Sequence, residues 1–246
     1  MGNCHNDRDR GIERRRPRMA GKGHRELTRQ SETKNGRTAI IEAAESLFAE
    51  YGLHGASFRQ ISEAANQKNA SAIQYHFGSR DQLVEAVFEN RMRYVNPKRL
   101  ALLEEVQATG GTGEARALVS TWVWPLAEEL RPREEGNHYV QFMARATREK
   151  QLVIQLAPAD LMTGWFLAAD RLKQLMTHLP EQVIRTRLLA ASDQCVNCLA
   201  AFEAEQAGAS PDFELQVETL IDMITAGLMA PMSAATEQAV KRRRKA

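Results

Sequence analysis

Residues 57–77, S-F-R-Q-I-S-E-A-A-N-Q-K-N-A-S-A-I-Q-Y-H-F, constrain the fold more than any other stretch, because they predict two short helices joined by a tight polar turn. Ser57 is expected to cap the first helix, and Gln60, three residues later, reaches back to it in a capping box. The apolar side chains then recur at the spacing of one helix face: Phe58, Ile61 and Ala65. The polar residues 66–69 interrupt this pattern and predict the turn.

The second short helix is predicted over residues 70–76. Ile73 and Phe77 lie one turn apart and are expected to face inward. The polar side chains then lie largely outward: Ser71, Gln74, Tyr75 and His76. Two short helices with a polar second helix are typical of a helix-turn-helix, whose second helix enters the major groove of DNA. The alternative is a small helical hairpin with a solvated outer face.

The segment Y-H-F-G-S-R-D-Q-L-V, after an Ala-rich helix and a polar turn, resembles the DNA-binding head of the TetR family of one-component regulators. The specific resemblance covers residues 37–87. The turn is one residue longer than the usual family pattern, and Gln74 stands where a tyrosine usually sits. The resemblance implies an all-α fold, with a helix-turn-helix domain over 37–82 and a helical ligand-binding and dimerisation domain over 83–235.

Length and composition favour a cytoplasmic protein of one or two domains. The 246-residue chain can bury a substantial core. No apolar run approaches the roughly 20 residues that cross a bilayer, so no membrane partner is expected. The charged N-terminus lacks the apolar core of a secretory signal. Three cysteines, an odd number, do not indicate a disulfide framework.

Charge is unevenly distributed along the chain. Residues 1–36 hold ten Lys/Arg against five Asp/Glu, and residues 241–245 read K-R-R-R-K, whereas residues 37–80 hold four of each sign. A neutral head attracts phosphates weakly, so a disordered basic arm over 1–36 is expected to supply part of the DNA affinity. Residues 236–246 are predicted to be a basic tail. Met19 is an alternative translation start to Met1.

An amphipathic helix over residues 37–51, ended by Gly52, is expected to form the base of the head. A long helix over 79–106, capped by Ser79, follows it, and Pro97 is expected to kink or break that helix near Asn96. Residues 107–113, Q-A-T-G-G-T-G, predict a linker. Further helices are predicted over 114–130, 137–150, 159–179, 180–205 and 212–229.

All three tryptophans fall in the body, close in sequence to phenylalanines and methionines. One interpretation is an apolar pocket for a small molecule between helices of the bundle. The alternative is ordinary core packing. The candidate pocket residues are Trp122, Phe142, Met143, Met162, Trp165 and Phe166.

The last two long helices, over 180–205 and 212–229, are the candidates for a homodimer contact. The apolar residues spaced to face a partner are Leu215, Leu220, Ile221, Ile224 and Leu228. The alternative is that this face completes the core of the monomer. Two heads about 34 Å apart would read two half-sites on one face of DNA.

Neither catalysis nor metal binding is indicated. Cys195 and Cys198 form a C-x-x-C inside a predicted helix, without a second pair or a His cluster at ligand spacing, and are interpreted as packing residues. No nucleophile elbow or phosphate loop is present. We expect no catalytic residues, no metal and no cofactor.

These features predict a homodimeric, ligand-responsive repressor whose partners are a palindromic double-stranded DNA operator and a small apolar effector. Gln74 and Ser71 are the candidates for base contacts. The candidates for phosphate contacts are Arg59, Lys68, Tyr75, His76 and Arg80, and the wider candidate surface adds Arg37, Ser57 and Asn69. The alternatives are an activator on the same fold, and a helical-bundle enzyme or carrier.

Overall fold

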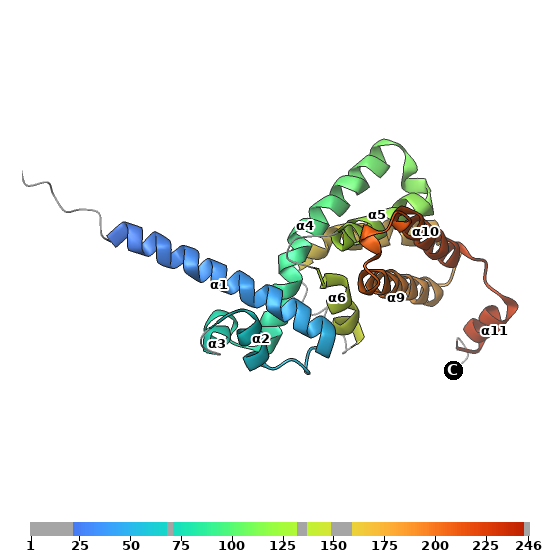
Figure 1. The fold of residues 1–246 in the computed structure, drawn as a ribbon. Helices are drawn as coiled ribbons and strands as arrows, with labels where there is room; N and C mark the ends of the chain where they lie inside the picture. The colour runs from blue at the N-terminus through green and yellow to red at the C-terminus, as the bar shows by residue number, and fades with distance from the viewer. Residues whose placement is uncertain (1–21, 68–70, 132–136, 149–158, 244–246) are drawn as a thin grey trace, which may run out of the picture.

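A computed structural model describes residues 22–67, 71–131, 137–148 and 159–243. Every regular element in these ranges is helical. Figure 1 shows a small head, in which α2 and α3 lie against α1, joined through α4 to a larger helical body. None of the described helices is long and apolar enough to cross a membrane.

The head consists of α1 (Lys22–Tyr51), α2 (Phe58–Ala64) and α3 (Ser71–Phe77). The first helix ends at Gly52, whose φ of 80° is left-handed and whose N–H donates to the Phe48 carbonyl oxygen. The predicted start of this helix was wrong: it begins at Lys22, so residues 22–36 are helical rather than disordered. Residues 1–21 lie outside the described residues.

The apolar pattern of the predicted helix-turn-helix is buried as expected. Ile61, Ala65, Ile73 and Phe77 lie in the core, while Phe58 is half-buried. Asn66 begins the turn with a φ of 52°, a left-handed conformation that asparagine tolerates better than most residues. The rest of the predicted turn, residues 68–70, is outside the described residues.

The long helix α4 (Arg80–Ala108) leads from the head into the body. Ser79 caps it by accepting the Gln82 N–H, as predicted. The predicted break at Pro97 is wrong, since the helix continues through this proline for eleven further residues. Pro97 is exposed, whereas Asn96 and Arg99 beside it are buried.

Five helices of the body lie at or near predicted positions: α5 (Ala115–Ala127), α6 (Tyr139–Arg148), α8 (Thr163–Leu175), α9 (Glu181–Ala204) and α10 (Phe213–Met229). A further helix, α11 (Ala234–Arg243), was not predicted. Short 3-10 turns flank them at Gly111–Gly113, Glu128–Leu130, Ala159–Met162 and Ala207–Ala209. Most of the predicted basic tail is therefore helical, in α11, which Figure 1 places at the far end of the body.

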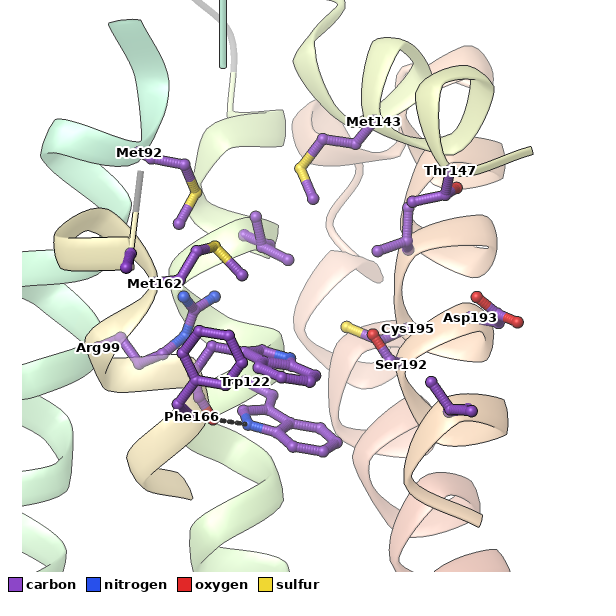
Figure 2. Close-up of a pocket in the computed structure, with 15 residues that line it drawn as sticks. Met92, Arg99, Trp122, Met143, Thr147, Met162, Phe166, Ser192, Asp193 and Cys195 are labelled. Atoms are coloured by element: carbon purple, nitrogen blue, oxygen red, sulfur yellow. Dashed lines mark hydrogen bonds between the residues drawn. The ribbon is translucent and has the colours of Figure 1, made fainter. Parts of the chain in front are cut away.

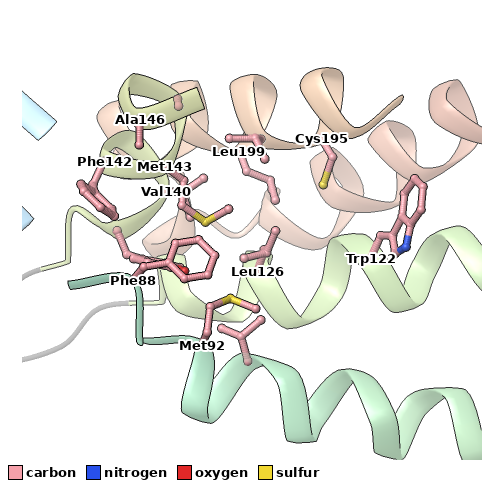
Figure 3. Close-up of a cluster of buried hydrophobic side chains, with 14 of the residues drawn as sticks. Phe88, Met92, Trp122, Leu126, Val140, Phe142, Met143, Ala146, Cys195 and Leu199 are labelled. Atoms are coloured by element: carbon pink, nitrogen blue, oxygen red, sulfur yellow. The ribbon is translucent and has the colours of Figure 1, made fainter. Parts of the chain in front are cut away.

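The body core lies between α4, α5, α6 and α9, where Figure 3 shows Phe88, Met92, Leu126, Val140 and Leu199 converging. The helix α6 packs against both α1 and α9, and α5 packs against both α4 and α10. Because α6 contacts α1, part of the body rests directly on the head.

The predicted dimer-facing residues are mostly inside the monomer. Leu220, Ile221, Ile224 and Leu228 are buried against α5 and α9, and only Leu215 of the five is exposed. The exposed face of α10 instead carries Leu215, Thr219, Met223, Ala226 and Gly227. The structure therefore shows the alternative, in which the face that carries Leu220, Ile221, Ile224 and Leu228 completes the core of the monomer.

Candidate functional site

The outer face of α3 is the best candidate for a DNA-reading surface. Ser71, Gln74 and Tyr75 are exposed, and Tyr75 keeps 81% of its surface accessible. The opposite face is anchored by the buried Ile73 and Phe77. A seven-residue helix with this division presents polar groups outward from a fixed base.

The capping box predicted at Ser57 is confirmed. The Ser57 hydroxyl oxygen accepts the Gln60 N–H at 3.2 Å, and the Ser57 N–H donates to Gln60 Oε1 at 2.9 Å. Both groups are exposed at the start of α2. Ser57 is thus first a structural cap, and its hydroxyl is engaged within the head.

The described cations of the head are mostly occupied by internal contacts. Arg59 pairs with Glu63 one turn away at 2.8 Å, and the guanidinium of Arg37 lies 5.1 Å from the centre of the Phe77 ring. Arg80 Nη1 donates to the carbonyl oxygens of Leu53 and Ala56, both at 2.6 Å. The structure therefore places Arg80 as a clamp between α4 and the loop after α1, and its phosphate contact stays a prediction.

His76 is half-buried beside these cations. Burial, and secondly the charge of Arg37, lower the pKa of His76 below its ordinary value. The neutral imidazole is therefore favoured near neutral pH, where it can donate one hydrogen bond but adds no positive charge. Lys68 and Asn69, the other predicted contacts, lie outside the described residues.

The body contains an apolar cavity of about 340 Å³. Five of the six predicted pocket residues line it: Trp122, Met143, Met162, Trp165 and Phe166. Phe142 was wrongly assigned, because its ring turns the other way, toward the head, with its centre 6.3 Å from that of Phe48. The lining residues that the sequence analysis missed are Met92, Arg99, Leu126, Thr147, Ala159, Leu189, Ser192, Asp193, Cys195 and Val196.

Two stacked indoles form one wall of the cavity (Figure 2). The Trp122 and Trp165 rings are 5.4 Å apart and 11° from parallel, and Trp122 Nε1 donates to the Trp165 carbonyl oxygen at 3.4 Å. The Phe166 ring meets Trp165 edge-on at 5.1 Å. This hydrogen bond orients the indole planes before any ligand enters.

One of the two missed charged residues, Arg99, could have been found from the sequence. It continues an apolar stripe of α4 formed by Met92, Val95 and Leu103, so it occupies a position at which a core side chain is expected. The Cys195 thiol also faces the cavity, and burial raises its pKa to about 12. This thiol is accordingly protonated and inert, which agrees with its interpretation as a packing residue.

A buried ion pair connects the head to the body. Glu45 of α1 receives two hydrogen bonds from Arg91 of α4, at 2.8 and 2.9 Å. The same carboxylate accepts the backbone N–H of His138, directly before α6, at 3.2 Å. Since α4 and α6 both line the cavity, one head residue contacts two of its walls.

Comparison with known proteins supports this division into head and body. Residues 40–87 match the family described as bacterial regulatory proteins, tetR family. A putative tetR family transcription regulator from Shewanella sp. PV-4 is 18% identical, with a TM-score of 0.51, over 76% of this chain and 97% of that one. The fatty acid degradation regulator FadR from Bacillus halodurans is 17% identical, with a TM-score of 0.50, over 79% and 99%. Among curated proteins, none matches this chain.

Proposed function

We propose that the chain is a DNA-binding transcriptional regulator of the TetR type. In this proposal it is a repressor that binds a palindromic operator as a homodimer and releases it when a small apolar molecule enters the body. The observation that carries the proposal is the outward polar face of α3 on a fully buried apolar base. Such a face reads base edges in the major groove.

The position of the cavity supports the response to a ligand. Met92 and Arg99 of α4 line it, and α4 is the helix that begins at the head. Met143 and Thr147 of α6 line the opposite side, and α6 packs on α1. A molecule that shifts α4 against α6 changes the geometry at Glu45, and hence the angle of the head. The proposed response is a shift between two head spacings, of which only one fits the operator.

The exposed face of α10 supports a dimer. Leu215 and Met223 keep 67% and 56% of their surfaces exposed, and the small Ala226 and Gly227 beside them permit close approach of a second helix. An added Cβ on Gly227 would meet no heavy atom within 4 Å, so this side of α10 is open in the monomer.

A gel-shift assay with the DNA that flanks the gene tests the proposal. We expect a saturable shift that survives competitor DNA and weakens as salt rises, because cationic contacts to phosphates release counterions. An absent shift, or one abolished equally by any competitor, would contradict operator binding.

Gln74 is proposed to contact a base. The Gln74→Ala substitution is expected to change the preferred operator sequence and to leave the circular dichroism spectrum and the oligomeric state unaltered. The cost at the affected base pair is expected to be about 1–3 kcal/mol. Gln174→Ala, exposed on α8, is the matched control. Unchanged sequence preference in Gln74→Ala would remove this residue from the reading surface.

A further inference from the structure

Arg99 places a buried positive charge in the wall of the body cavity. Its side chain is only 1% exposed, and it lines the cavity from α4. Its Nε donates to the Thr121 carbonyl oxygen at 3.1 Å. Its Nη1 is buried and has no hydrogen-bond acceptor among the described residues. One end of the guanidinium is therefore fixed, while the other offers an unused donor.

The surrounding backbone holds this side chain in place. Gly164, at the start of α8, packs against it so closely that an added Cβ would lie 3.2 Å from Arg99 Cγ and 2.9 Å from Asn96 Oδ1. The Gly164 N–H donates to Asn96 Oδ1 at 3.0 Å, and Asn96 Nδ2 donates to Thr163 Oγ1 at 3.1 Å. These bonds lock α8 onto α4, so Arg99 has little room to turn away.

Among the residues that the structure describes, no carboxylate forms an ion pair with Arg99. Burial lowers the pKa of Arg99 to about 10, while the Cys195 thiol and the Tyr139 phenol act weakly in the opposite direction. The guanidinium thus remains protonated at neutral pH. The carboxylate of Asp193 also borders the cavity, but it is exposed and lies on the opposite wall, on α9 (Figure 2). A buried arginine is costly unless an anion completes its hydrogen bonds.

The remainder of the wall is suited to a hydrocarbon. Trp122, Trp165 and Phe166 provide aromatic surface, and Met92, Met143 and Met162 provide flexible apolar side chains. Figure 2 shows the Arg99 guanidinium among these groups, next to Met162. The site thus combines one polar anchor with a largely apolar interior, as small-molecule sites do.

We propose that the cavity binds a small apolar monocarboxylate, whose carboxylate accepts hydrogen bonds from Arg99 and whose hydrocarbon part lies against the indoles. The guanidinium is matched to a carboxylate in both charge and shape. This proposal deepens the ligand response proposed above by naming the chemical class of the ligand.

Calorimetric titration of the full-length wild-type protein tests the proposal with matched acid and neutral probes. Naphthoate is compared with naphthamide, and octanoate with octanol, so that aromatic and aliphatic bodies are distinguished. We expect at least one acid to bind about tenfold or more tightly than its neutral partner, since a charge-assisted bond replaces a neutral one. Equal affinities within both pairs, or no binding by either acid, would overturn the proposal.

Arg99→Met keeps the volume of the side chain and removes its charge. We expect this variant to lose the preference for the acid while it still binds the neutral partner. Arg93→Met, an exposed residue of the same helix, is the control that retains the preference. A preference that persists in Arg99→Met would refute the role of Arg99. If Arg99→Met does not fold, the comparison of acid and neutral probes in the wild type still decides.

The DNA assay separates this inference from the proposed function. If an acid binds through Arg99 without releasing the operator, the ligand site stands and the proposed ligand response fails. If the operator is bound and neither acid binds, the carboxylate site fails while DNA binding stands.

Discussion

The positively charged side chain of Arg80 makes its hydrogen bonds inside the head. Its guanidinium bridges the Leu53 and Ala56 carbonyl oxygens and lies 5.1 Å from the centre of the Phe58 ring. It therefore ties the start of α4 to the loop between α1 and α2. A change of head angle produced through α4 reaches α2 by way of this side chain.

Arg80→Met is expected to lower the free energy of unfolding by roughly 2 kcal/mol, because two carbonyl oxygens lose a charged donor. Urea unfolding followed by circular dichroism measures the change. Arg59→Met, which removes only an exposed pair with Glu63, should leave the free energy of unfolding nearly unchanged. Equal effects of the two substitutions would show that Arg80 is not a clamp.

For single residues, the sequence predicted those roles that depend on residues a few positions away in the chain. The capping box of Ser57 and Gln60 follows from their separation of three residues, and the structure confirms it. The contacts of Arg80 and Arg99 depend on carbonyl oxygens 22 to 27 residues away in the chain. No local spacing encodes such contacts. The apolar stripe of α4 indicates a core position for Arg99 but not its Thr121 partner, and nothing near Arg80 in the sequence indicates its Leu53 and Ala56 partners.

The N-terminus of α6 is held by two carboxylates from different parts of the molecule. Glu45 of α1 accepts the His138 N–H, and Glu203 of α9 accepts the Val140 and Gln141 N–H groups at 3.2 and 2.7 Å. Both acidic groups suit the positive end of the helix dipole. They connect α6 to the head on one side and to the body on the other.

Burial raises the pKa of Glu203 to about 7, against the lowering effect of the two N–H donors. Because the folded protein favours the protonated acid, this group makes the free energy of unfolding fall as pH rises from about 4.5 to about 7, by at most on the order of 3 kcal/mol. Glu203→Gln cannot ionise and should lose this part of the slope. Chemical denaturation at several pH values measures it.

The exposed Glu205→Gln, near the end of the same helix, is the control for this experiment and should retain the wild-type slope. Identical slopes for wild type and Glu203→Gln would show that Glu203 does not titrate in this range.

The positions of the elements could largely be predicted, but their orientations could not. Apolar spacing and Pro, Gly and Ser boundaries located most helices to within a few residues, but not the start of α1 at Lys22 or the helix α11. The sequence of α10 is apolar on more than one face, so periodicity did not distinguish the core-facing side from the exposed side that carries Leu215 and Met223. For the cavity, the grouping of tryptophan, phenylalanine and methionine in the sequence indicated five lining residues, but only tertiary packing decides that Phe142 points to the head.

The whole molecule is expected to act as a dimer through the exposed face of α10. Met223→Arg should produce monomers in light scattering, because a contact between copies would bury an unpaired charge. The same variant should lose tight operator binding, since one head contacts only one half-site. Gln174→Arg on α8 is the control and should remain dimeric. If Met223→Arg remained dimeric, the dimer interface would not involve this face of α10.

Because α1 is one uninterrupted helix, a small rotation at one of its ends moves the other end over a larger distance. Its thirty residues extend about 45 Å at the usual helical rise, and its contacts with α6 join it to the body. A pivot of about 10° about the Gly52 end sweeps the other end through roughly 8 Å, more than one helical turn. A displacement of about 1 Å at a contact one helical turn from that pivot therefore produces a movement larger than a base-pair step.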